Sequence, residues 1–569
     1  MNTDYIIKVA RGIEPADLVI KNASIINVFT EEICKADVAI AGEVIAGVGQ
    51  NYKGRKEIDA EGKYLSPGFI DGHVHIESST LLPSQFAKAV LPAGTTTLIT
   101  DPHEISNVFG LQGISFMHEC VKDLPVDVYT MLPSCVPASP YETSGFELND
   151  YDLSLLLDSP WVLGIAEMMN YPGVLNLDKC AMSKIKLGLA RNKRIDGHAP
   201  GLSGKDLCAY IAAGITSDHE TTGIEEAKEK LAQGMYLMVR EGSAAKDLNV
   251  LIPLLKNINT RKCMFVTDDR HPADLQEHIN LMVKKCVEYG VSPVKAVQMA
   301  SLNTAEYFNI RNLGAIAPGY LADILILDNL TDFKPEKVFK KGKLVAQNGR
   351  ACFDGKDKEL SVLRGSVNVK WIEPGDFKIP AASDHVKAIE IIPGRLITKA
   401  ARSKIKLENG YAQANTDGDI LKILVFERHK ASGNIGKGFV KGFGLKSGAI
   451  ASTVAHDSHN MMVIGADDAD MYMAAVELVK AQGGKIVVDK GRVVSMLPLP
   501  IAGLMSTGSF EEVVKKTLEL KEAAANLGCK LDNPFMNMAF LSLSVIPEIK
   551  ITDKGVFDVS KSEFIDIFK

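Results

Sequence analysis

The 569-residue sequence lacks the features that mark several large classes of protein. Its 9 cysteines are scattered and never spaced C-x-x-C, which argues against a disulfide framework or a thiolate zinc knuckle. The longest apolar run, Val494 to Met505, contains two prolines and is too short to span a membrane. The N-terminus has no basic segment followed by a long apolar stretch, as a signal peptide would. We therefore expect a cytoplasmic protein that has no membrane partner.

The sequence also has no surplus of positive charge. It contains 64 Lys and Arg against 70 Asp and Glu, a formal net charge of −6. Nonspecific binding to nucleic acid usually needs a basic face, so nucleic acid is not an expected partner. Hydrophobic residues make up 46% and charged residues 24%, values that are ordinary for globular proteins and exclude extended disorder.

Several nucleotide-related motifs are missing as well. His75-Ile-Glu77 matches the H-x-E of cytidine-type deaminases, but that zinc site also needs a C-x-x-C, which the chain does not contain. The glycine-rich stretch from Gly442 to Gly448 has Ser447 where G-x-G-x-x-G needs its third glycine. It also fails the P-loop pattern, so we interpret it as turns.

The two ends of the chain differ in pattern from its middle. Short β-like runs punctuated by Gly and Asn cover 17–65 and return at 314–352. Two such segments around a long insert predict one small composite β domain, formed by residues 1–66 plus 313–365. From about residue 380 a new mixture of strands and helices begins, which predicts a separate α+β domain at 380–569.

The middle of the chain, residues 67–312, alternates strands with helix-length stretches. This alternation is typical of a (β/α)8 barrel, although an open doubly wound sheet gives the same pattern. We predict an α/β fold: a metal-dependent barrel with a small composite β domain and a C-terminal α+β domain. The eight candidate strands are Gly68–His75, Thr95–Thr100, Val126–Leu132, Val162–Met168, Ile195–His198, Ile215–His219, Tyr236–Arg240 and Met264–Asp268.

Candidate metal ligands lie at the ends of five of these strands. The active site of a (β/α)8 barrel lies at the C-terminal ends of its strands, so side chains at these positions converge. A single H-x-H is weak evidence, and the signal comes from the whole set. Four imidazoles with two carboxylates suit Zn²⁺, Mn²⁺ or Fe²⁺ better than Mg²⁺ or Ca²⁺. The six candidates are His73, His75, Glu167, His198, His219 and Asp268.

The motifs around these residues resemble those of a known family. Pro67-Gly-Phe-Ile-Asp-Gly-His-Val-His75 after a small β domain is similar to the start of the amidohydrolase superfamily. Longer strings resemble, more narrowly, the bacterial adenine deaminases, and that likeness covers nearly the whole chain. The strings are His73-Val-His-Ile-Glu-Ser-Ser79, Asp101-Pro-His-Glu-Ile105, Asp196-Gly-His-Ala-Pro200, Ser217-Asp-His-Glu220, Thr267-Asp-Asp-Arg-His-Pro272, Ala455-His-Asp-Ser-His-Asn460 and Leu497-Pro-Leu-Pro-Ile-Ala502.

The resemblance implies hydrolytic deamination of adenine to hypoxanthine and ammonia by a metal-activated hydroxide, a reaction of purine salvage. Many superfamily members bridge two metals with a carboxylated lysine on the fourth strand, where this sequence has Glu167. Glu167 could bridge two ions in the same way, so we expect a binuclear centre of Mn²⁺ or Fe²⁺, with Zn²⁺ an alternative. Coordination of only one ion by Glu167 remains open.

The same resemblance suggests roles for residues around the metals. Ammonia leaves readily only when protonated, and Asp268 is our candidate for the proton transfer, as acid–base group, ligand or both. His219 is a ligand that could assist, and Asp269 is left for a purine nitrogen, although the two aspartates could be exchanged. Softer candidates for substrate binding are Glu77, His103 and Glu104, for which a supporting hydrogen bond is an equal alternative.

Other interpretations remain open at this stage. His456 and His459 could close over the active site, help to bind metal, or form a polar turn, and we favour the turn. A deacetylase acting on an N-acetyl sugar phosphate would use a similar barrel, and some related barrels are non-catalytic assembly proteins. The expected substrate is a small purine base, and the size of the chain favours a homodimer.

Overall fold

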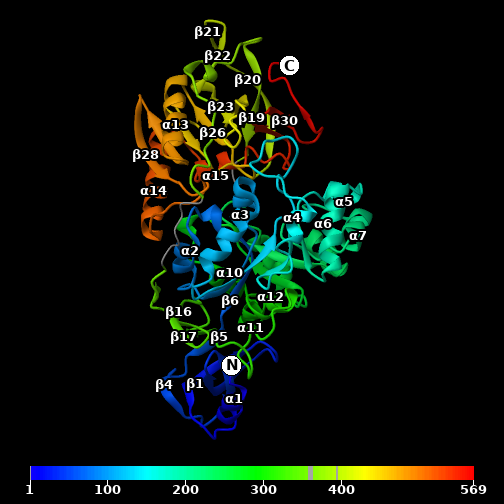
Figure 1. The fold of residues 1–569 in the computed structure, drawn as a ribbon, viewed down its shortest axis with the longest axis vertical. Helices are drawn as coiled ribbons and strands as arrows, with labels where there is room; N and C mark the ends of the chain where they lie inside the picture. The colour runs from blue at the N-terminus through cyan, green and yellow to red at the C-terminus, as the bar shows by residue number, and fades with distance from the viewer. Residues whose placement is uncertain (1, 356–362, 393–394) are drawn as a thin grey trace.

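The structure is a computed structural model that describes residues 2–355, 363–392 and 395–569. Its elements form three units along the long axis of the molecule, with the N-terminal sheet at one end and the C-terminal sheet at the other (Figure 1). Residues 356–362, at the end of the predicted segment 313–365, lie outside the described residues. So do residues 393–394, within the predicted domain at 380–569.

The first unit is a nine-stranded sheet built from both sides of the barrel segment. Strand β5 (Tyr64–Pro67) joins the two parts, because it pairs in parallel with β1 (Ala16–Asn27) and antiparallel with β15 (Ile324–Leu327). The sheet therefore has the composite form that the sequence predicts. Its other strands are β2 (Glu32–Ala41), β3 (Val44–Gly49), β4 (Gly54–Asp59), β16 (Pro335–Lys340), β17 (Lys343–Gln347) and β18 (Arg350–Ala351), and helix α1 (Thr3–Ala10) precedes them.

The middle unit contains eight parallel strands, and neighbouring strands in its sheets follow one another in the sequence, except where the last pairs with the first. One ladder follows the order β10-β9-β8-β7-β6-β14 and a second the order β11-β12-β13. Together they are β6 (Phe69–His75), β7 (Thr95–Thr100), β8 (Asp127–Leu132), β9 (Val162–Met168), β10 (Arg194–Gly197), β11 (Ser217–Asp218), β12 (Tyr236–Arg240) and the eighth strand, formed by β13 (Cys263–Val266) and β14 (Asp268–Asp269).

Two connections close these ladders into a ring. The eighth strand pairs with β12 through β13 and then with β6 through β14. On the opposite side, the amide of Thr216 donates to the carbonyl of Ile195, with an N···O distance of 3.2 Å, and joins β11 to β10. The ring excludes the open doubly wound alternative and agrees with the predicted barrel. Strand β11 is shorter than predicted, and the amide of Ala199 beside it donates to the side chain of Asp218, at Oδ1.

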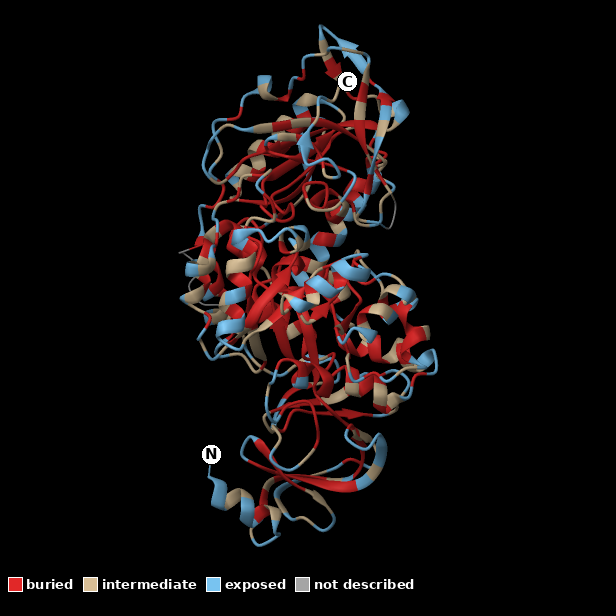
Figure 2. Ribbon diagram, turned by 90° about the vertical axis from the view of Figure 1, so that its right-hand side faces the viewer, coloured by how far each residue is buried: buried red, intermediate tan, exposed pale blue. Residues whose placement is uncertain are grey.

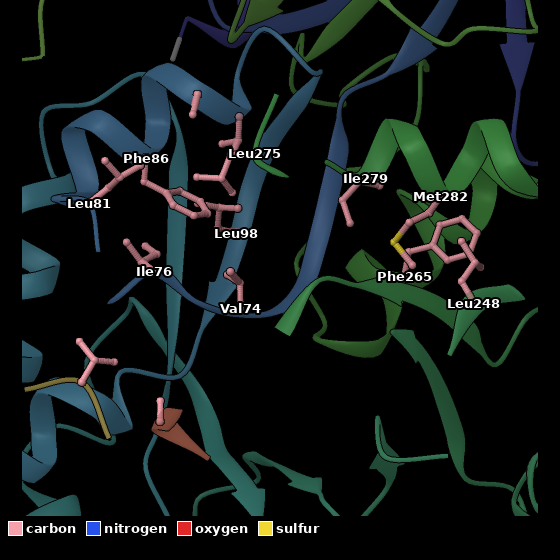
Figure 3. Packing of buried hydrophobic residues seen from close by; sticks show 14 of the residues in the cluster. Val74, Ile76, Leu81, Phe86, Leu98, Leu248, Phe265, Leu275, Ile279 and Met282 are labelled. Carbon is pink, nitrogen blue, oxygen red and sulfur yellow. The ribbon is translucent and has the colours of Figure 1, made fainter. Parts of the chain in front are cut away.

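Helices follow the strands and bury their apolar faces against the barrel. Val74 of β6 and Leu98 of β7 belong to one buried cluster with Phe86 of α2 and Leu275 (Figure 3). Burying aliphatic and aromatic side chains from water stabilises this packing. The main helices are α2 (Pro83–Val90), α3 (His103–Val121), α6 (Lys179–Ala190), α7 (Gly204–Ala212), α8 (Ile224–Ala232), α9 (Leu248–Leu255), α10 (Ile279–Glu288), α11 (Pro293–Met299) and α12 (Leu302–Tyr307).

The C-terminal unit is a mixed α+β structure, as predicted. Its eight-stranded sheet has the order β20-β19-β24-β23-β26-β25-β27-β28, and buried residues line its strands (Figure 2). The strands are β19 (His385–Ile391), β20 (Thr398–Lys404), β23 (Ile420–Phe426), β24 (Ile435–Lys441), β25 (Ala449–Ser452), β26 (Met461–Gly465), β27 (Gly484–Asp489) and β28 (Arg492–Pro498); the helices are α13 (Asp468–Lys480), α14 (Phe510–Asn526) and α15 (Pro534–Ala539). Among the described residues, no helix has both the length and the apolar character needed to cross a membrane.

Candidate active site

The six predicted ligands meet at the mouth of the barrel. Each comes from the C-terminal end of a strand or from the residue that follows it, and all lie within a region largely closed to solvent. His73 and His75 stand on the same side of β6, with 3.2 Å between their Nε2 atoms. Asp268 Oδ1 lies 3.1 Å from Nε2 of His75. The structure therefore brings together side chains that are up to 195 residues apart in the sequence, between His73 and Asp268.

Glu167 lies at the centre of this cluster. Its Oε1 atom is 3.7 Å from Nε2 of His73 and 3.5 Å from Nε2 of His75. Its Oε2 atom is 2.6 Å from Nδ1 of His198 and 3.2 Å from Nε2 of His219. The two oxygens of one carboxylate thus face two different histidine pairs, which is the arrangement required of a ligand that bridges two cations.

The hydrogen bonding of His75 leaves a lone pair directed into the cluster. Its Nδ1 lies 2.8 Å from the backbone carbonyl oxygen of Asp101, which can only accept, so Nδ1 carries the proton. The Nε2 atom then has a free lone pair, as in metal-binding histidines whose other nitrogen is fixed by a carbonyl. Burial, followed by the neighbouring imidazoles, holds the pKa of His73 well below its usual value.

The charges of the cluster also fit divalent cations. Glu167 and Asp268 are buried carboxylates, and taking two negative charges out of water is costly unless positive charge lies beside them. Several groups of imidazole nitrogens and carboxylate oxygens lie within 4.8 Å of one another, a spacing at which they could ligate one ion. The donors are nitrogen and oxygen, the set that suits Mn²⁺, Fe²⁺ and Zn²⁺.

Asp268 and Asp269 have different surroundings. Asp268 has a φ of 59°, in the left-handed region, so the eighth strand bends here and simple alternation does not decide which way the side chains point. Asp268 Oδ2 accepts a 2.9 Å hydrogen bond from Arg240 Nη1, while Asp269 accepts one from the hydroxyl of Ser78. Burial alone would raise the pKa of Asp268, but its contact with His75 and the charge of Arg240 hold it well below its usual value.

The predicted substrate residues lie beside the cluster. Glu77 is buried; its Oε1 accepts a 3.4 Å hydrogen bond from the amide of Ile105, and its Oε2 has no hydrogen-bond partner among the described residues. Burial raises the pKa of Glu77 to about 7. His103 Nδ1 is 3.1 Å from Asp101 Oδ2 and 3.4 Å from Glu167 Oε1, so His103 directly adjoins the ligands.

The C-terminal unit contributes two further histidines at this mouth. His456 Nδ1 is 2.9 Å from Oε1 of Glu104, and His459 Nε2 contacts Oε2 of the same carboxylate. Both histidines are buried. They are therefore packed on the barrel mouth rather than forming only a local polar turn, the interpretation that the sequence favoured.

Four polar residues that sequence reasoning did not assign also shape the site. Asp101 holds His103, and Arg240 contacts both Asp268 and Glu220. Lys230 donates to Asp218 Oδ2 at 2.9 Å, and Asp218 links the loops that carry His198 and His219. The sequence could have indicated Asp101 and Arg240, because each ends or directly follows a predicted barrel strand. Lys230 is on helix α8, and nothing in its sequence position predicts its inward direction.

A barrel whose mouth gathers histidines and carboxylates in this way defines an amidohydrolase. Residues 64–345 match the model of the amidohydrolase family, and residues 395–563 match that of the adenine deaminase C-terminal domain. Among solved structures, a dihydropyrimidinase from Brevibacillus agri NCHU1002 aligns with a TM-score of 0.46 and 14% identity, over 59% of this chain and 96% of that chain.

Relatives along the full chain narrow the assignment. An adenine deaminase 2 from Carboxydothermus hydrogenoformans is 50% identical over 99% of both chains. An adenine deaminase from Dehalococcoides mccartyi is 49% identical, again over 99% of both chains. The chain belongs to the adenine deaminase family. The family resemblance and the fold class predicted from the sequence are confirmed.

Proposed function

We propose that this protein hydrolyses adenine to hypoxanthine and ammonia at a binuclear divalent-metal centre in the barrel mouth. The observation that supports this most strongly is Glu167, whose two carboxylate oxygens face two separate histidine pairs. Family membership supports the substrate, because the curated relatives of full length are named adenine deaminases.

The residues that would hold the metals fall into two groups that share Glu167. His73, His75 and Asp268 form one group, and His198 and His219 form the other. We expect Mn²⁺ or Fe²⁺, with Zn²⁺ as an alternative, because imidazole and carboxylate ligands suit all three. A bound pair of such cations lowers the pKa of water from about 15.7 toward ~7 and so supplies a nucleophile at neutral pH.

Asp268 is placed to carry the proton that the reaction must move. Asp268 Oδ1 faces the histidine ligands and, as a carboxylate oxygen, can accept a proton from the attacking water. Arg240 holds the other oxygen, Oδ2, and so fixes the direction of Oδ1. After water adds to C6 of adenine, Asp268 returns this proton to the exocyclic nitrogen, and ammonia leaves.

The purine ring would lie against polar groups beside the ligands. Glu77, Glu104 and Asp269 offer carboxylate oxygens, and His103 offers an imidazole. Adenine has both N–H donors and ring-nitrogen acceptors, so a mixture of ionised and protonated groups suits it. Burial raises the pKa of Asp269, and the charge of Asp268 raises it further.

The wider setting of the reaction is also part of this proposal. We expect the chain to work in the cytoplasm, in purine salvage, as a homodimer, without nucleic acid or a membrane as partner. Size-exclusion chromatography with light scattering measures the oligomeric state directly.

The experiment that tests the proposed function is product identification with metal-loaded protein. The purified chain, supplied with Mn²⁺, is incubated separately with adenine, adenosine, cytosine, guanine and N-acetylglucosamine 6-phosphate, and products are identified by mass. We expect hypoxanthine and ammonia from adenine alone. Release of acetate from the sugar phosphate would favour the deacetylase alternative, and consumption of adenosine alone would refute the free-base assignment.

A further inference from the structure

A second cluster of histidines and a carboxylate lies between the barrel and the C-terminal unit. It consists of Glu104, His456 and His459, all buried, and its ligand-type atoms lie within 4.8 Å of one another. The composition resembles that of a metal site, but the hydrogen bonds of His459 point to a different role.

The backbone fixes which nitrogen of His459 carries the proton. The amide of Ala455 donates to His459 Nδ1 at 3.1 Å, so Nδ1 must be an acceptor. Burial lowers the pKa of His459 to about 4, which keeps the ring neutral and places its single proton on Nε2. That N–H donates to Glu104 Oε2. In this tautomer both nitrogens are engaged, and His459 has no lone pair left for a cation.

A buried arginine holds this histidine in place. Arg428 Nε donates to the carbonyl of His459, and its Nη1 and Nη2 donate to the carbonyls of Ser366 at 2.9 Å and Ala502 at 3.0 Å. One guanidinium group thereby binds the backbone at three places that are far apart in the sequence. The position of His459 Nε2 is thus set by its own unit, independently of Glu104.

The other oxygen of Glu104 remains available. Oε1 is buried, with His456 Nδ1 2.9 Å away and His103 Nε2 3.4 Å away. His103 in turn adjoins Glu167, so Glu104 Oε1 is one side chain removed from the predicted metal ligands. A carboxylate oxygen has two acceptor positions, so Oε1 can accept a hydrogen bond from a ligand in addition to one from His456.

We propose that His459 is a positioning residue of the active site: its Nε2–H fixes Glu104 through Oε2 and leaves Oε1 to accept an N–H of the purine base. The C-terminal unit thereby takes part in substrate binding without itself contacting the substrate. This inference deepens the proposed function and rests on it for the identity of the base.

A double-mutant cycle tests the inference on the metal-loaded full chain. The variants are His459→Met, His459→Gln, Glu104→Gln and the double variant His459→Met with Glu104→Gln; His385→Met, at a partly exposed histidine, is the control. We expect His459→Met to lower kcat/KM for adenine by roughly 10- to 100-fold, the loss of one hydrogen bond to a charged group. His459→Gln, which keeps an N–H donor, should recover much of this loss.

If His459 had only a structural role, the effects of His459→Met and Glu104→Gln on kcat/KM would add. We expect that they do not. In the Glu104→Gln background, His459→Met should cost little more, because Glu104 transmits its effect. Metal content, measured by mass spectrometry, should equal that of the wild type in every variant. Additive losses, or a cation lost specifically on His459→Met, would overturn the inference.

A spectroscopic measurement covers the case in which His459→Met does not fold. In zinc-loaded wild-type chain labelled with ¹⁵N-histidine, one imidazole should show an unprotonated Nδ1 and a protonated Nε2, and its signals should disappear in His459→Gln. A protonated Nδ1 at His459 contradicts the inference. A fully metal-loaded wild type that shows this tautomer but does not deaminate adenine would refute the proposed function instead.

Discussion

The molecule holds two clusters of histidine and carboxylate that look alike in composition but differ in what lies behind the rings. In the barrel mouth, Nδ1 of His75 keeps its proton and donates to a backbone carbonyl, which leaves the lone pair of Nε2 free to bind a cation. In the cluster next to it, Nδ1 of His459 faces a backbone N–H, which forces the proton onto Nε2. The first arrangement suits a metal ligand, and the second suits a hydrogen-bond donor.

Residue type and spacing therefore do not distinguish a metal site from a hydrogen-bonded one. The backbone group that contacts Nδ1 of each ring sets the tautomer, and the tautomer determines whether Nε2 can bind a cation or donate a hydrogen bond. The carboxylates alone do not show this division, because Glu167 and Glu104 each face histidines with both oxygens.

The largest effect is expected from removing the carboxylate shared by the two groups of ligands. Glu167→Ala should lower adenine turnover by roughly 10,000-fold or more, because both proposed cation sites would lose a ligand. Bound metal, counted by mass spectrometry, should fall with it. Glu511→Ala, on the exposed side of α14, is the control and should match the wild type. Normal metal content and turnover in Glu167→Ala would contradict the assignment of the barrel-mouth cluster as the metal site.

A second prediction separates the two neighbouring aspartates. Asp268→Asn should lower kcat by about 100- to 10,000-fold, the usual contribution of a positioned acid–base group. Most of the metal should stay bound, because the other five predicted ligands are unchanged. Asp269→Asn should act mainly on KM. The reverse pattern would mean that the two roles are exchanged.

The third prediction concerns the ion pairs that support the metal cluster. Arg240 contacts Glu220, Asp247 and Asp268, and all three carboxylates lose their cationic partner in Arg240→Met. We expect a loss of about 3 to 5 kcal/mol in the free energy of unfolding, as for other broken buried ion pairs. Urea denaturation followed by circular dichroism measures it. Arg261→Met, at a largely exposed arginine, should unfold like the wild type.

The smallest effect is expected at a neutral hydrogen bond behind His198. The buried hydroxyl of Tyr210 donates to the carbonyl of Met168 at 2.8 Å and accepts from the amide of His198 at 3.1 Å. Tyr210→Phe should lower the free energy of unfolding by about 1 to 2 kcal/mol. Tyr151→Phe is the exposed control, and equal unfolding midpoints for both variants would show that this support is dispensable.

The barrel and its predicted ligands could be foreseen because they follow from local rules. Alternating strands and helices give parallel strands, and polar residues such as His73 and His198 at the strand ends must then meet. The hydrogen bond between Ala455 and His459 follows no such rule, because it depends on the path of one loop. The contact of His459 with Glu104 joins residues 355 positions apart and depends on how two units pack, which no periodicity in the sequence encodes.

An anomalous-scattering map of crystals grown from manganese-loaded protein tests the contrast between the two clusters most directly. We expect strong peaks among the side chains of His73, His198 and Glu167. We expect no peak among Glu104, His456 and His459. A map without a peak at the barrel mouth, or with one at the second cluster, would contradict this contrast.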